Sequence, residues 1–67
     1  MITEREYLEA ARTGNLQVIN EYILQKSDIF VKNGFDMNAL MYASVYGHIN
    51  VVNRLLEVFP LEHIFAK

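Results

Sequence analysis

Few residues in this sequence could carry out chemistry, and they lie far apart. The histidines are His48, which follows a glycine, and His63, which follows a glutamate. The only serines are Ser27 and Ser44, and without cysteine there is no disulfide, thiolate zinc site or thiol nucleophile. No His-x-x-x-His or Glu-x-x-His pair occurs, and the three glycines are too dispersed to form a phosphate-binding loop. We therefore predict no enzyme activity, no catalytic residues, no cofactor and no metal.

The composition is typical of a soluble globular protein. The chain has 67 residues, enough for one domain at most, and 52% of them are hydrophobic, too many for a disordered tail. The net charge is −2 and the six basic residues form no run, so we expect neither nucleic acid nor a membrane as partner. No apolar stretch has the length of a signal peptide or a membrane span. We expect a cytoplasmic protein.

An internal repeat organises the chain. Aligning Gly14 with Gly47, an offset of 33, matches small residues with small ones and apolar residues with apolar ones, without a gap. The matched pairs are Ala10 and Ala43, Ala11 and Ser44, Leu16 and Ile49, Val18 and Val51, Ile19 and Val52, Asn20 and Asn53, Tyr22 and Leu55, and Ile23 and Leu56. The sequence thus contains two related units.

The first unit is predicted to form two helices joined by a tight turn. Thr3 and Glu6 have the spacing of a capping box, which predicts a helix over 4–13. Gly14 can take the left-handed conformation that ends a helix. A second helix is predicted over 16–24, where apolar residues recur at spacings of three and four.

The second unit repeats this plan. One helix is predicted over 39–46, ending at Gly47, and another over 50–58, before Pro60. Between the units, residues 26–37 are rich in Ser, Asp, Asn and Gly, which predicts an ordered, finger-like turn.

The tail, 60–67, is predicted to form a short helix. Leu61, Ile64 and Phe65 would lie on one face of it and cover the end of the second unit. The expected organisation is a single all-α domain over 1–67, with repeat one at about 1–33, repeat two at about 34–58 and a terminal cap at 59–67.

The second unit resembles the ankyrin repeat. Residues 38–48, Asn-Ala-Leu-Met-Tyr-Ala-Ser-Val-Tyr-Gly-His, lie over that family's signature Thr-Pro-Leu-His-x-Ala-Ala-x-x-Gly-His, and the period of 33 is similar. The resemblance covers about 4–58. It departs from the family where Asn38-Ala39 replaces Thr-Pro, where Met41 replaces histidine, where Asp36 replaces a usual glycine, and where Arg5-Glu6-Tyr7-Leu8 opens the first unit.

The resemblance implies a short ankyrin-type solenoid that binds another protein through loop tips and first-helix faces. The family's contact positions fall on Arg12, Thr13, Phe35, Met37, Val45 and Tyr46, and also on Gly34. Several are apolar or aromatic, as in interface cores. The alternative is that Phe35 and Met37 pack back onto their own helices. The resemblance also implies that His48 bonds to backbone in the turn.

Two other functions stay open. A fragment or self-associating unit of a longer ankyrin array is the first, because two repeats fall short of the roughly three usually needed for stability; a homo-oligomer would follow. The second is a DNA-binding helix-turn-helix, disfavoured because Asn20 and Asn53 stand where that motif has an apolar core residue.

The repeat register also predicts the core. Close helix approach is expected at Ala10, Ala11, Ala43 and Ser44. Packing between the repeats is expected at Ile19, Ile23, Val52 and Leu56.

Overall fold

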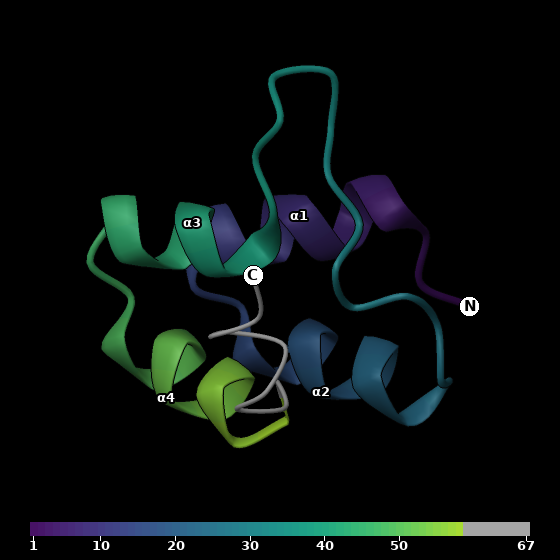
Figure 1. The fold of residues 1–67 in the computed structure, drawn as a ribbon. Coiled ribbons are helices and arrows are strands. Elements are labelled where there is room, and N and C mark those ends of the chain that lie inside the picture. The colour runs from purple at the N-terminus through teal and green to yellow at the C-terminus, as the bar shows by residue number, and fades with distance from the viewer. Residues whose placement is uncertain (59–67) are drawn as a thin grey trace, which may run out of the picture.

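The computed structural model describes residues 1–58, which form four helices in two layers. The helices are α1 (Glu4–Thr13), α2 (Leu16–Leu24), α3 (Ala39–Val45) and α4 (Ile49–Val58). Figure 1 shows α1 beside α3 in one layer and α2 beside α4 in the other, with loop 25–38 projecting from the layer of α1 and α3. The described part of the chain contains no strand, so the all-helical prediction is confirmed.

Local signals set the helix boundaries almost as predicted. Thr3 and Glu6 form the capping box, each side chain accepting a hydrogen bond from the other residue's amide, at 3.1 and 2.9 Å. Asn15 and Asn38 cap α2 and α3 through their side-chain oxygens. α3 ends and α4 begins one residue earlier than predicted. The predicted helix over 60–67 lies outside the described residues.

Alanines allow α1 and α3 to pack closely. Ala10 and Ala11 on α1, and Ala39 and Ala43 on α3, are all buried. The prediction that Ser44 belongs to this contact is wrong, because Ser44 is exposed. It points away from α1, on a side of α3 where the described residues provide no further helix.

The contact between α2 and α4 has a different register from the one predicted. The fully buried residues of this layer are Ile19, Tyr22, Val51 and Leu55. Ile23 and Val52 are half-buried against the core, but Leu56 is exposed, so its prediction is wrong. The buried stripe of α4 runs one residue earlier, through Val51 and Leu55, so Leu56 lies outside it.

Two stacked tyrosines join α1, α2 and the start of loop 25–38. The rings of Tyr7 and Tyr22 lie 3.9 Å apart between centroids, at 11° to each other. The Tyr7 hydroxyl donates to the Ile29 carbonyl at 2.9 Å, and the Tyr22 hydroxyl donates to the Asp28 carbonyl at 3.0 Å. Burial raises the pKa of both phenols, and neighbouring negative charge adds to the effect.

These raised pKa values predict loss of stability at alkaline pH. Above the ordinary tyrosine pKa of 10.0 the unfolded chain releases phenolic protons that the folded chain retains, so the free energy of unfolding falls. Each retained proton contributes a slope of about 1.4 kcal/mol per pH unit. When the free energy of unfolding is measured by urea titration and plotted against pH, Tyr7→Phe should reduce the slope above pH 10.0. Tyr46→Phe, at an exposed ring, is the control, and an unchanged slope in Tyr7→Phe would contradict the assignment.

His48 fastens the second repeat to the first. Its Nε2 donates to the Arg12 carbonyl at 2.8 Å, so the bond to backbone that the resemblance implies is present and crosses between repeats. The imidazole lies against Gly14, where an added Cβ would come within 2.6 Å of Nδ1. Gly14 has a φ of 83°, a conformation that disfavours other residues. Position 14 therefore requires glycine for two independent reasons.

The three glycines allow these two reasons to be separated. Gly47→Ala, at φ 74° but in open space, should cost about 1–2 kcal/mol through backbone strain alone. Gly14→Ala should cost more because the His48 ring must also move. Gly34→Ala, with neither constraint, should be neutral or stabilise by about 0.4–1 kcal/mol. Thermal and urea unfolding rank the three variants by their loss of unfolding free energy. Equal losses at positions 14 and 47 would show that the contact of Gly14 with the His48 ring is unimportant.

Candidate protein-binding site

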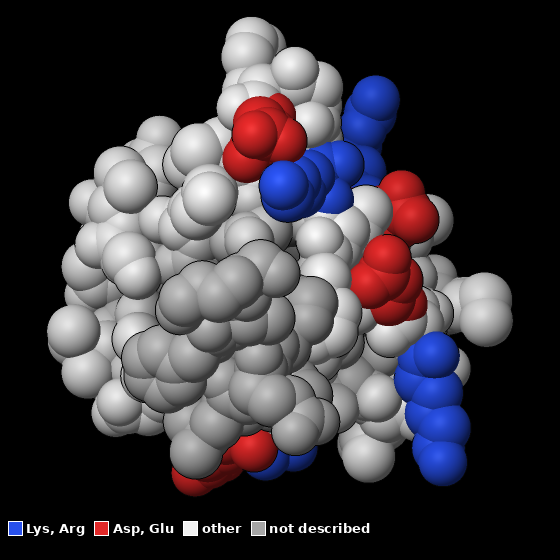
Figure 2. Space-filling model, in the orientation of Figure 1, with Lys and Arg blue, Asp and Glu red and all other residues white. Residues whose placement is uncertain are grey.

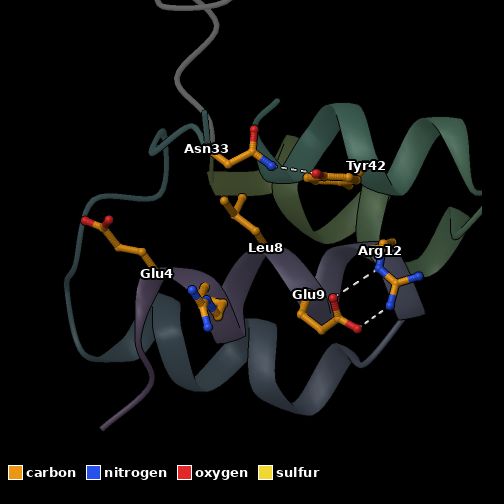
Figure 3. Close-up of a pocket in the computed structure, with 7 residues that line it drawn as sticks. Glu4, Leu8, Glu9, Arg12, Asn33 and Tyr42 are labelled. Carbon is orange, nitrogen blue, oxygen red and sulfur yellow. Dashed lines mark hydrogen bonds and ion pairs between the residues drawn. The ribbon is translucent and has the colours of Figure 1, made fainter. Parts of the chain in front are cut away.

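A shallow groove of about 370 Å³ lies between α1, α3 and loop 25–38. Its lining residues are Glu4, Arg5, Leu8, Glu9 and Arg12 from α1, Asn33 from the loop and Tyr42 from α3. In Figure 3 the Asn33 and Tyr42 side chains meet on one side of Leu8, while Glu9 and Arg12 pair farther along α1. The groove thus has an apolar floor at Leu8 and Tyr42 and charged groups along its α1 side.

Asn33 organises the projecting loop and joins it to α3. Its Oδ1 accepts from the amides of Phe35 and Met37 at 2.9 and 3.2 Å, and its Nδ2 donates to the Tyr42 hydroxyl. Its backbone amide donates to the Met37 carbonyl at 3.1 Å, which closes the loop. Asp36, at the position of the family's usual glycine, takes the left-handed conformation with φ 64°. Aspartate tolerates this conformation better than most residues, so the turn survives the replacement.

A row of aromatic and charged side chains continues from the groove along α3. The Tyr42 and Tyr46 rings, one helical turn apart, have centroids 6.3 Å apart. The Arg12 guanidinium lies 5.9 Å from the Tyr46 centroid and makes a two-point ion pair with Glu9. The bond from Arg12 lowers the pKa of Glu9, and the bond to Glu9 raises the pKa of Arg12. Because both groups face solvent, this pair orders Arg12 more than it stabilises the fold.

The structure distributes the six predicted contact residues over four places. Arg12 and Tyr46 are in contact. Met37 and Val45 line a second depression, of about 500 Å³, on the other side of α3. Phe35 is 85% exposed in the loop, so it does not pack back onto the helices, whereas Met37 is half-buried. Thr13 lies apart, donating its hydroxyl to the Glu9 carbonyl at 3.0 Å.

Sequence analysis did not identify three residues that shape the groove. Leu8 stands out in the sequence only as a departure from the family signature, although it is 7% exposed and lies at the groove floor. Tyr42 could have been found from its spacing of four residues from Tyr46. Asn33 carries a turn signal, but its bond to Tyr42 joins residues nine positions apart and has no local signature.

Neither a metal site nor a membrane span is found within 1–58. No group of three or more potential metal ligands occurs there. None of the helices in that range is long and apolar enough to cross a bilayer.

Comparison with known proteins identifies the family. The model for ankyrin repeats (three copies) matches residues 8–65, most of the chain, and the protein belongs to the ankyrin repeat family. Members are generally protein–protein interaction modules and are typically not enzymes. Comparisons with curated proteins and with solved structures give no match.

The role of Asn33 can be tested directly. Asn33→Ala removes the acceptor of two loop amides and the donor to Tyr42, and should lower the free energy of unfolding by about 1–3 kcal/mol. Hydrogen exchange should become faster at the Phe35 and Met37 amides but not at amides in the middle of α2. Asn53→Ala, at an exposed amide on α4, is the control. Unchanged exchange in Asn33→Ala would show that the loop is held by other contacts.

Proposed function

We propose that this protein binds a segment of a partner protein along the groove between α1, α3 and loop 25–38. The observation that carries the proposal is that two exposed aromatic residues adjoin residues that line the groove. Phe35 donates its amide to Asn33, and the Tyr46 ring contacts Arg12. Aromatic residues and arginine are enriched at protein interfaces and provide much of the binding energy there. The groove and its rim offer both kinds of side chain.

The contacts around Arg12 support the same surface. Arg12 is held by Glu9 on one side and by the Tyr46 ring on the other. A side chain ordered before binding loses less conformational entropy when the complex forms. Asn33 similarly fixes the loop that carries Phe35. The proposed surface therefore combines a preformed floor, an ordered arginine and an exposed aromatic at the tip.

Helix α2 provides exposed residues that lie outside the proposed binding surface. Gln17 and Glu21 on α2 are exposed and polar, and they lie in the layer away from the groove. The proposal therefore assigns them no contact with the partner, and their variants serve as controls.

Affinity capture from the native host, followed by titration of the retained partner, tests this proposal. Tyr46→Ala and Phe35→Ala should each weaken binding by about 1–3 kcal/mol, or roughly 5- to 150-fold in the dissociation constant. Gln17→Ala and Glu21→Ala should bind like wild type, and circular dichroism checks that every variant is folded. The proposal fails if the two aromatic variants bind normally while the α2 variants do not, or if no partner is retained.

A further inference from the structure

Loop 25–38 carries the dipeptide Asn33-Gly34, and no other asparagine of the sequence precedes a glycine. Glycine has no Cβ and a wide range of backbone conformations, so its amide nitrogen can approach the side chain of a preceding asparagine. Gly34 is exposed, and Asn33 is half-buried. No described residue accepts a hydrogen bond from the Gly34 amide. This nitrogen is therefore available as a nucleophile toward the Asn33 side chain.

Two backbone amides are aimed at the oxygen of the Asn33 side chain. The amides of Phe35 and Met37 donate to its Oδ1 at 2.9 and 3.2 Å. When a nucleophile adds to an amide carbonyl carbon, negative charge develops on the carbonyl oxygen, and backbone donors that are already in place stabilise this charge. The loop therefore provides, around Asn33, the hydrogen-bond donors that favour attack on its side-chain amide.

Water reaches this dipeptide. Loop 25–38 projects from the layer of α1 and α3, and Figure 2 shows charged side chains of both signs in the upper part of the view, where the loop lies in Figure 1. Lys32 and Asp36, on either side of the dipeptide, form an ion pair of 3.4 Å, and both side chains are exposed. Solvent can therefore accept a proton from the Gly34 amide and can also act as a reactant at Asn33.

We propose that Asn33-Gly34 is a self-modification site at which Asn33 is converted to aspartate and isoaspartate. The Gly34 nitrogen loses its proton to water and forms a bond to Cγ of Asn33. The bond from Cγ to Nδ2 then breaks, and this nitrogen takes a proton from water and leaves as ammonia, which gives a succinimide. Water opens the succinimide at one of its two carbonyl carbons. Breaking the bond from Cγ to the Gly34 nitrogen gives aspartate, and breaking the original peptide bond gives isoaspartate.

Both products change the contacts that hold the loop. Each lacks the Nδ2 group through which Asn33 donates to the Tyr42 hydroxyl. In isoaspartate the main chain also runs through the former side chain and is longer by one carbon. This disturbs the loop closure, in which the Asn33 amide donates to the Met37 carbonyl at 3.1 Å. Modification therefore loosens the connection between the loop and α3.

The same change affects the groove, and this consequence rests on the proposed function. Each product adds a carboxylate at a position that lines the groove together with Glu4 and Glu9. The loosened loop also carries Phe35, whose amide donates to Asn33 in the unmodified chain. Modification of Asn33 should therefore weaken partner binding, because the exposed aromatic residue is no longer held in place.

Ageing of the full chain in warm neutral buffer, followed by peptide mass spectrometry, tests the modification. Asn33 should be converted at least about tenfold faster than Asn38. Asn38 is the matched internal control, because its side chain also accepts from a backbone amide, at 2.9 Å, but it precedes alanine. Gly34→Ala should slow conversion at least about tenfold, and it should fold, since its Cβ meets nothing within 4 Å beyond its chain neighbours. Absence of isoaspartate at position 33, or an equal rate in Gly34→Ala, overturns the inference.

Comparison with the unfolded chain tests the contribution of the loop. In concentrated urea the amides of Phe35 and Met37 no longer donate to Asn33, so its conversion should be slower than in the folded protein. Faster conversion in urea would show that the folded loop protects Asn33, and the inference would then be wrong.

Hydrogen exchange and partner titration test the consequence of the modification. In the aged chain the Phe35 and Met37 amides should exchange faster than in the fresh chain, and this measurement needs no partner. The aged chain should bind the partner about fivefold more weakly, whereas Gly34→Ala aged in parallel should keep its own starting affinity. Isoaspartate formation with unchanged exchange and binding would show that the modification does not control the groove. If no partner is retained, the proposed function fails, while the mass and exchange measurements still decide the modification.

Discussion

The contact between His48 and Gly14 is the constraint on which the arrangement of the two repeats depends. The imidazole occupies the space that a side chain at position 14 would need, and its Nε2 bonds to the carbonyl of Arg12, 36 residues away in sequence. This places the turn before α4 on the end of α1 and leaves α3 beside α1, where alanines permit close packing. The same contact positions the candidate site, because Arg12 supplies the carbonyl for His48 and the guanidinium beside Tyr46.

The helices were predictable because their signals are local. A capping box at Thr3 and Glu6, and a left-handed glycine at 14 and at 47, act within one turn of chain, and the observed bounds agree to within one residue. The family resemblance followed from the 33-residue period together with the residues at 38–48 that lie over the family's signature. The sequence placed Arg12 and Tyr46 near each other among the family's contact positions. It did not predict that the guanidinium lies over the ring, because the fold brings these residues together from distant parts of the sequence.

The features that the sequence did not predict depend on what each side chain meets in space. Tyr7 and Tyr22 are separated by a turn, yet they stack and anchor the loop through carbonyls beyond α2. Leu56 matches Ile23 in the repeat register but is exposed, because no helix within residues 1–58 packs over α4 as α4 packs over α2. Sequence matching treats the repeats as equal, whereas the two repeats have different neighbours within the described residues.

The short helix α3 presents three sets of side chains, and helical periodicity keeps them apart. Ala39 and Ala43 are buried, Tyr42 lines the groove with Tyr46 one turn farther along, and Met41 and Ser44 line the depression on the other side of the helix. Residues three or four apart share a face, so each surface can change without disturbing the others. Val45 is the exception, because it lines the depression opposite the groove and directly precedes Tyr46, so a substitution at Val45 changes the surface on both sides of the helix.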